Sequence, residues 1–246
     1  MRSLIIAPGD EESRLRAALK CGADALVIDL VVAPEARAKA RSGAARLLAK
    51  ARSVAPTLMV RVNPLGDAET DLDLDAVMPH APFAIVLPQA LAAKLQQLSA
   101  RLAVREALAG LEDGSTRIVA AADTAAALIG LTGARARTAR LVGIAWDAEA
   151  LKTDIGAKTC RDELGTYAGP WRLARDLTLL AATAAGVAAI DAASAGARDR
   201  ADLRAEALAA RRDGFAAKLA LDPDQAKVIN EVFGAMPPTP RFSANP

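Results

Sequence analysis

The sequence predicts an α/β protein, a (β/α)8 TIM barrel in which eight parallel strands are surrounded by helices. Eight short apolar runs alternate with longer helical segments along 246 residues, which is a usual length for one such barrel. The apolar runs are almost uninterrupted, as is typical of parallel strands that are covered on both faces. An open doubly wound sheet is the alternative, but it usually has fewer strands, and the chain has no Gly-x-Gly-x-x-Gly or Walker loop.

The expected strands are short and rich in Val, Ile, Leu and Ala, as buried strands are. In chain order they are Ser3–Ala7, Ala25–Asp29, Thr57–Val62, Ala84–Leu87, Thr116–Ala121, Arg140–Ala145, Val187–Asp191 and Ala217–Leu221.

Helical segments lie between and after these strands, and some of their ends carry clear signals. Pro34 suits the first turn of a helix, and Asp222 before Pro223 is typical of an N-cap. We expect one barrel domain over residues 1–233, followed by an irregular Pro-rich tail over 234–246. The expected helices are Asp10–Lys20, Pro34–Ala55, Asp71–Met78, Ala90–Ala109, Thr124–Thr132, Tyr167–Ala185, Arg200–Asp213 and Pro223–Phe233.

Composition and charge exclude several classes of protein. The formal net charge is only +2, so no strong field favours nucleic acid or an anionic membrane. Leu4–Pro8 is too short for a signal peptide, and no apolar run is long enough to span a membrane. Cys21 and Cys160 are the only cysteines, which gives no disulfide framework and fits the reducing cytoplasm.

Polar side chains follow most of the expected strands. In such barrels the carboxyl ends of the strands form one mouth, where active sites are built. Carboxylates with an arginine suit a hard cation such as Mg²⁺ that holds a carboxylate or carbonyl substrate and stabilises a developing enolate. The residues expected to converge there are Asp10, Asp29, Arg61, Asn63, Gln89, Asp123, Asp147, Glu149, Asp191 and Lys218.

Each of these residues also has a structural interpretation. Arg61 and Asp29 are alternatively a structural ion pair, and Asp123 is alternatively the cap of the next helix. Asp147 and Glu149 are alternatively solvated loop acids, and Lys218 is alternatively paired with a neighbouring acid for structural reasons. His80 is the only histidine, and we expect it to be structural.

A set of motifs in fixed order resembles the citrate lyase β-subunit-like group of the HpcH/HpaI aldolase superfamily, from residue 2 to about 233. The motifs are Ala7-Pro8-Gly9-Asp10, Gly22-Ala23-Asp24-Ala25, Arg61-Val62-Asn63-Pro64, Ile85-Val86-Leu87-Pro88, Ala189-Ile190-Asp191, Gly214-Phe215, Lys218-Leu219-Ala220 and Val228-Ile229-Asn230-Glu231-Val232-Phe233.

This resemblance implies a barrel of the phosphoenolpyruvate/pyruvate-like superfamily that uses Mg²⁺. It also implies lyase or thioesterase chemistry on short acyl-CoA thioesters or related carboxylic acids, in homotrimers, hexamers or larger assemblies. We expect Arg61 and Asp29 to be catalytic. The substrate-binding residues expected are Arg61, Pro8, Gly9, Asn63 and Pro88, and the metal ligands expected are Asp123, Asp147 and Glu149.

The chain also departs from the family pattern at the site. An acidic Glu-Asp pair is missing after Leu30, where Val31 and Val32 follow directly, and we expect these valines to form an apolar lid. Asp123 stands where the family has a metal-binding Glu, and Ala150 stands where it has a metal-binding Asp. Two hypotheses therefore remain: a Mg²⁺-dependent carbon–carbon lyase, or a diverged, weakly active or inactive member that serves as a binding or assembly subunit.

Overall fold

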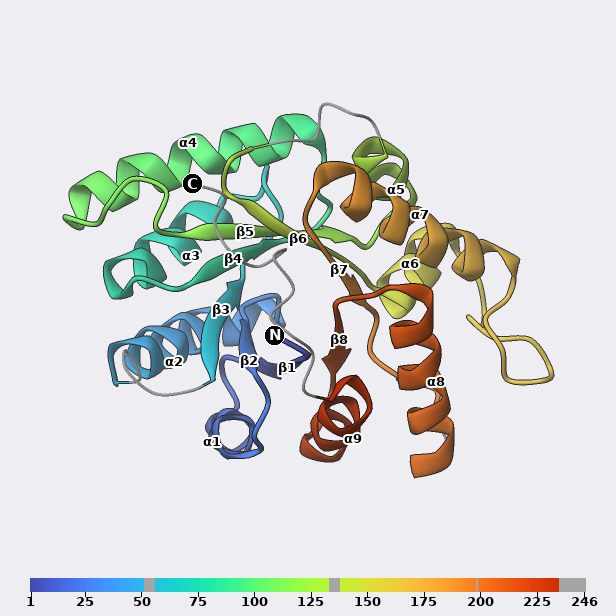
Figure 1. Ribbon diagram of the computed structural model, residues 1–246. Coiled ribbons are helices and arrows are strands. Elements are labelled where there is room, and N and C mark those ends of the chain that lie inside the picture. Colours follow the sequence, from blue (N-terminus) through green and yellow to red (C-terminus); the bar gives the residue numbers. More distant parts are fainter. Residues whose placement is uncertain (51–55, 133–137, 198, 235–246) are drawn as a thin grey trace.

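Eight parallel strands close into a barrel in which each strand pairs with the next along the chain and β8 pairs with β1. The computed structural model describes residues 1–50, 56–132, 138–197 and 199–234. Figure 1 shows the helices arranged around the outside of the strands. The predicted (β/α)8 barrel is therefore confirmed.

The strands agree with the predicted ones to within one residue at each end. Their bounds are β1 Ser3–Pro8, β2 Ala25–Asp29, β3 Thr57–Arg61, β4 Ala84–Leu87, β5 Arg117–Ala122, β6 Leu141–Trp146, β7 Ala188–Asp191 and β8 Ala217–Ala220.

The helices cover the outside of the barrel. Two short 3₁₀ turns flank them: η1 Pro34–Ala36 directly precedes α2, and η2 Met78–His80 directly follows α3. The α-helices are α1 Glu12–Lys20, α2 Arg37–Lys50, α3 Glu69–Val77, α4 Ala92–Leu108, α5 Ala125–Leu131, α6 Ala148–Ile155, α7 Gly169–Ala185, α8 Arg200–Asp213 and α9 Pro223–Phe233.

Two helix predictions need comment. The helix expected over residues 34–55 begins as η1 and continues as α2, while residues 51–55 lie outside the described part, as do 235–246 of the expected tail. Helix α6 is absent from the predicted helices, because Asp147 and Glu149 are interpreted from the sequence as mouth or loop acids rather than as a helix N-terminus. No helix in the described part of the chain is both long and apolar enough to cross a bilayer.

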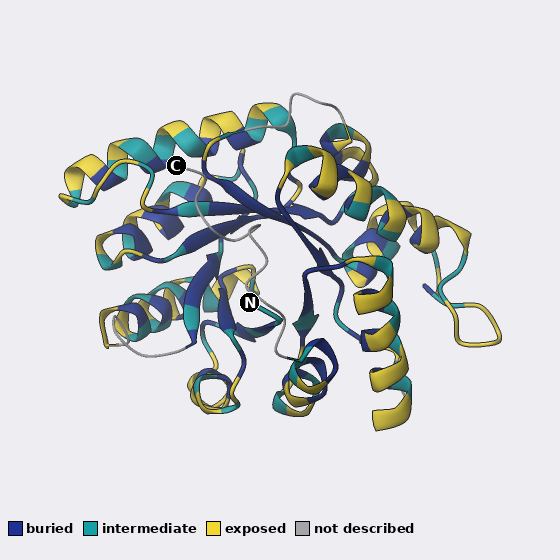
Figure 2. Cartoon of the chain, viewed as in Figure 1, coloured by how far each residue is buried: buried dark blue, intermediate teal, exposed yellow. Residues whose placement is uncertain are grey.

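The apolar core has two layers, one inside the barrel and one between the strands and the helices. Met59, Val27 and Val119 belong to the inner layer, while Ile28 and Val60 belong to the outer layer. Burying one such side chain contributes roughly 1.5–3 kcal/mol. In Figure 2 the strands are dark blue, and the exposed residues lie along the outer sides of the helices.

The alternation of side chains along each strand decides which polar residues reach the mouth. Successive side chains point to opposite faces of a strand. Val27, Met59 and Ala121 point into the barrel, so the residues two positions later, Asp29, Arg61 and Asp123, continue on the inner side. This is the geometry that assembles the candidate site.

Candidate active site

Arg61 and Asp29 form a bidentate ion pair at the ends of the neighbouring strands β3 and β2, where they are register partners. Arg61 Nε donates to Asp29 Oδ1 at 2.8 Å, and Arg61 Nη2 donates to Asp29 Oδ2 at 2.6 Å. Arg61 and Asp29 therefore form the ion pair that the alternative interpretation predicts. Two donor groups of Arg61 are occupied, whereas Nη1 faces Asp147 Oδ2 at 3.8 Å.

Asp29 also shapes the loop that follows it. Its Oδ1 accepts a hydrogen bond from the backbone N–H of Val31 at 2.9 Å, and its carbonyl accepts one from Gly9 at 2.8 Å. The side chain of Val31 is 38% exposed. The turn around Asp29 thus leaves Val31 partly exposed, and the expected apolar lid stays a prediction.

The acidic surroundings keep Arg61 charged. Burial disfavours the guanidinium cation, but the hydrogen bonds to Asp29 and the charges of Asp29, Asp147 and Asp123 outweigh that effect and raise the pKa of Arg61. A cation held in this way is a ready partner for a carboxylate or carbonyl oxygen.

Asp123 lies directly after β5 and is 7% exposed. Burial is the main cause that raises its pKa to about 6, and the charge of Asp147 adds to this, while a hydrogen bond from Gln89 and the charge of Arg61 oppose it. Two carboxylates of the mouth therefore interact with each other and with one arginine. Such mutual repulsion is relieved by a proton or by a cation.

Gln89 supplies the hydrogen bond that orients Asp123. Its backbone N–H donates to Asp123 Oδ1 at 2.7 Å, and its φ of 50° is one of only two positive values among the described non-glycine residues. A left-handed residue of this kind carries local strain, which the surrounding structure must support. Sequence reasoning places Gln89 at the mouth but gives no sign of this backbone contact.

Asp147 caps helix α6. Its Oδ1 accepts hydrogen bonds from the backbone N–H groups of Glu149 at 3.0 Å and Ala150 at 3.1 Å. The other oxygen, Oδ2, is the one nearest Arg61. One carboxylate oxygen of Asp147 thus caps α6, and the other faces Arg61 at the mouth.

Glu149 lies apart from this group. Its side chain is 52% exposed, and it accepts hydrogen bonds from Lys152 and from Cys160 Sγ. Hydrogen bonding to Lys152 is the main cause that lowers the pKa of Glu149. The described residues contain no group of three His, Cys, Asp or Glu side chains that could together hold a metal ion. Asp123, Asp147 and Glu149 are therefore not assembled into one cluster.

A small cavity of about 30 Å³ lies beneath the polar group. Arg61, Asp123 and Asp147 line it together with Trp146 and apolar side chains of the inner layer. This volume matches roughly one water molecule. Only the small end of a substrate would enter it.

The other expected substrate-binding residues serve mainly structural contacts. Asn63 is 1% exposed, and its amide donates to Leu30 O at 3.2 Å and to Asp73 Oδ2 at 2.8 Å. Pro88 directly follows β4 and is buried. Gly9 packs against α2, and Pro8 ends β1. None of these four residues lines the 30 Å³ cavity.

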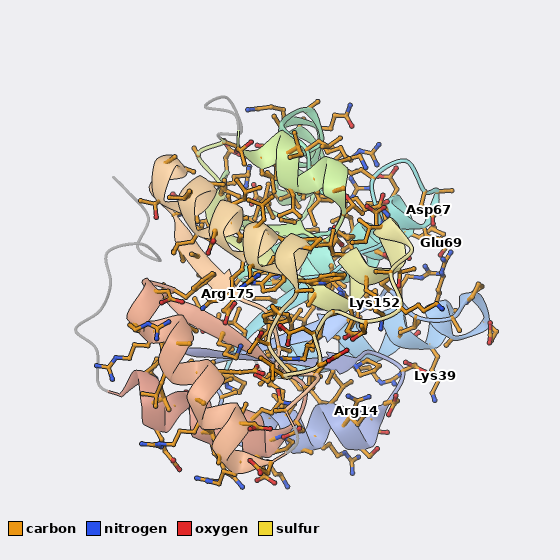
Figure 3. The ribbon with its side chains drawn as sticks, turned by 90° about the vertical axis from the view of Figure 1, so that its right-hand side faces the viewer. Arg14, Lys39, Asp67, Glu69, Lys152 and Arg175 are labelled. Carbon is orange, nitrogen blue, oxygen red and sulfur yellow. The ribbon has the colours of Figure 1, made fainter. Side chains whose placement is uncertain are left out.

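Asp191 and Lys218 do not point into the mouth, contrary to one expectation. For Lys218 the alternative interpretation, a structural pair with a neighbouring acid, is correct. Ile190 belongs to the inner layer, so the next residue, Asp191, points outward. There it accepts hydrogen bonds from Lys218 Nζ at 3.0 Å, Trp146 Nε1 at 2.9 Å and Arg175 Nε at 3.2 Å. Figure 3 shows Arg175, which belongs to α7, on the face of the molecule that is turned to the viewer.

Comparison with known proteins agrees with this architecture. The family model for HpcH/HpaI aldolase/citrate lyase matches residues 2–223. A citrate lyase subunit beta-like protein of Deinococcus radiodurans is 30% identical over 95% of this chain and 80% of its own length. A (3S)-malyl-CoA thioesterase of Cereibacter sphaeroides is 30% identical over 96% of this chain and 78% of its own length.

Solved structures give the same picture. Protein CitE of Mycobacterium tuberculosis, in complex with magnesium and acetoacetate, superposes with a TM-score of 0.80 at 27% identity and covers 98% of this chain and 94% of its own. The family model spans most of the chain, so the resemblance inferred from the motifs is confirmed. This chain belongs to the HpcH/HpaI aldolase/citrate lyase family.

Proposed function

We propose that the protein is a Mg²⁺-dependent carbon–carbon lyase that acts on a short acyl-CoA thioester or a related carboxylic acid. The observation that carries this proposal is the grouping of Arg61, Asp123 and Asp147 around one cavity at the mouth of the barrel. The thioesterase and the magnesium-bound CitE among its relatives support the substrate class and the metal.

Asp123 and Asp147 are the residues that suit Mg²⁺. The ion commonly takes one or two protein carboxylates and completes its coordination with water and substrate oxygens. The burial and the neighbouring negative charge that raise the pKa of Asp123 are relieved when a cation binds between the two acids. Glu149, which is paired with Lys152, is left out of the proposed site.

The protein's own residues would position the substrate. Arg61 Nη1 would donate to the carboxylate or carbonyl oxygen of the substrate, because Nε and Nη2 are held by Asp29. Asp29 then acts as a positioning residue that fixes the plane of the guanidinium. Apolar side chains such as Val27 and Val119 line the cavity below and limit the access of water. Bound Mg²⁺ would stabilise the negative charge that develops on the enolate oxygen.

One observation favours the second candidate function, a diverged subunit that binds a ligand without turnover. Asp29 occupies two of the donor groups of Arg61, and it therefore competes with an incoming substrate for the same cation. If the pair does not open, the mouth holds a small ligand at most.

Calorimetry and turnover together test the proposal. We expect Mg²⁺ to bind the wild-type protein at millimolar concentration, acetoacetate to bind more tightly in its presence, and citramalyl-CoA to be cleaved to pyruvate and acetyl-CoA. Arg61→Ala should lower kcat/KM by about 100-fold or more, as the loss of one donor to a developing oxyanion does. Arg117→Ala is the matched control, because Arg117 begins β5 at the opposite end of the barrel.

The outcomes separate the two candidates. Ligand binding without turnover, with Mg²⁺ making no difference, would favour the diverged subunit. No heat of Mg²⁺ binding in the wild-type protein would contradict the metal-dependent lyase, whatever acetoacetate does.

A further inference from the structure

Helix α2 carries basic side chains on two sides, and only one side is neutralised. The helix has five basic residues and no acidic one. Arg41 Nη1 lies 2.5 Å from Glu69 and 3.2 Å from Asp73, and Arg37 lies 3.7 Å from Asp67. These acids come from α3 and the loop before it. The remaining three cations have no ion-pair partner among the described residues; they are Lys39, Arg46 and Lys50.

These three cations border a groove of about 570 Å³ between α1 and α2. Leu15, Leu19 and Leu47 also line the groove and contribute apolar surface. The lining includes five basic and two acidic side chains, a net charge of +3. One of the acids, Glu12, is already paired with Arg16 at 2.5 Å. The groove therefore combines an apolar surface with unneutralised positive charge.

The end of the groove is fixed by a close backbone contact. A Cβ atom on Gly43 would lie 2.1 Å from the carbonyl oxygen of Gly9, so α2 packs directly on the segment that follows β1. In Figure 3, Lys39 extends away from Asp67 and Glu69, toward the side of the molecule where Arg14 of α1 lies. The cations thus border a rigid groove rather than a loop.

The groove has the size and chemistry of a small-molecule site. Ligand pockets commonly measure about 300–1,000 Å³ and combine apolar walls with a few charged groups. Lysine and arginine side chains pair well with phosphate oxygens, whereas the leucines are covered only by an apolar part of the ligand. Inorganic phosphate alone would leave the half-buried Leu19 and Leu47 facing water.

We propose that the α1–α2 groove binds an organic phosphate, a small molecule with a phosphate group beside an aromatic or aliphatic body. Lys39, Arg46 and Lys50 would pair with the phosphate, and Leu19 and Leu47 would contact the body. Gly9 and Asp10, which the sequence analysis places at the mouth, line this groove, whereas Arg61, Asp123 and Asp147 do not. The proposal therefore uses other side chains than the proposed lyase site does.

Fluorescence anisotropy with N-methylanthraniloyl-AMP tests the site. We expect saturable binding to the wild-type protein and binding at least about tenfold weaker, or 1.4 kcal/mol, for N-methylanthraniloyl-adenosine, which lacks the phosphate. The triple variant Lys39→Gln, Arg46→Gln, Lys50→Gln should lose at least as much affinity. Arg37→Gln removes a cation from the paired side of the same helix and should change the affinity by less than about twofold.

Three results would overturn the proposal: no binding by the wild-type protein, equal binding of the probe without phosphate, or an equal loss in Arg37→Gln and the triple variant. Arg61→Ala should keep its affinity for the probe, and loss of binding in that variant would place the probe in the mouth instead. The single variant Lys39→Glu, at an exposed position, repeats the test if the triple variant does not fold.

Discussion

Replacement of Asp123 by Asn should make the protein more stable at neutral pH. The folded-state pKa of Asp123 is about 6, against an ordinary value of 3.8, so the folded protein holds this proton more tightly than the unfolded chain does. The contribution of Asp123 to the free energy of unfolding therefore falls as the pH rises from about 4 to about 6 and stays low above that. The difference amounts to about 3 kcal/mol, because one pKa unit corresponds to about 1.4 kcal/mol.

Asparagine keeps an oxygen for the hydrogen bond from Gln89 but carries no charge. Urea unfolding of both proteins between pH 4 and pH 8 measures the effect, since all other carboxylates are common to the two. We expect Asp123→Asn to gain up to about 3 kcal/mol relative to wild type as the pH rises through this range. Addition of Mg²⁺ above pH 6 should stabilise the wild type alone.

A pH-independent difference between the two proteins would refute the reasoning, because it would mean that Asp123 does not titrate differently in the folded and unfolded states. Stabilisation of both proteins by Mg²⁺ would place the ion elsewhere.

Three further changes probe the scaffold around the site. Asp147→Ala should cost about 1 kcal/mol of unfolding free energy through loss of the α6 cap, whereas Asp147→Ser should restore the cap but not Mg²⁺ binding by calorimetry. Gly43→Ala should cost about 1–3 kcal/mol or more in urea unfolding, as overpacking does, because its Cβ would meet Gly9; an unchanged midpoint would contradict this. Glu106→Gln should cost about 3–5 kcal/mol, because it leaves Arg140, a buried partner at 2.7 Å, with one acid only, and thermal unfolding that matches wild type would argue against it.

Alternation along a strand shows which residues share a face, but not which face is turned inward. Ile190 and Asp191 are adjacent, so only one of them reaches the barrel interior, and both faces of the strands are covered by apolar layers. The position of Asp191 at the strand end, taken alone, predicts a place at the mouth, and that prediction is wrong because β7 turns Ile190 inward. In β2 and β3 the apolar neighbours Ile28 and Val60 point outward instead, and Asp29 and Arg61 reach the mouth.

Other features depend on contacts that sequence patterns do not reveal. The hydrogen bond of Gln89 to Asp123 comes from a backbone N–H, which every residue except proline carries. Helix α6, with eight residues, is missed although the seven-residue α5 is predicted, because the role of Asp147 as its N-cap is a contact that the sequence analysis does not recognise. The bidentate geometry of Arg61 and Asp29 depends on the register of β2 and β3, which the separate strand sequences leave open.

The indole of Trp146 is buried on the outer side of β6, directly behind the mouth. The chain has two tryptophans, and Trp146 lines the 30 Å³ cavity beside the acids while its ring meets Tyr167 edge to face at 5.3 Å. Its N–H is bonded to Asp191 on the outer side of the strand. In a Trp171→Phe background, the emission of this single fluorophore would follow changes in packing on the outer side of β6, behind the acids of the mouth. The protein thus contains an intrinsic reporter one residue away from Asp147.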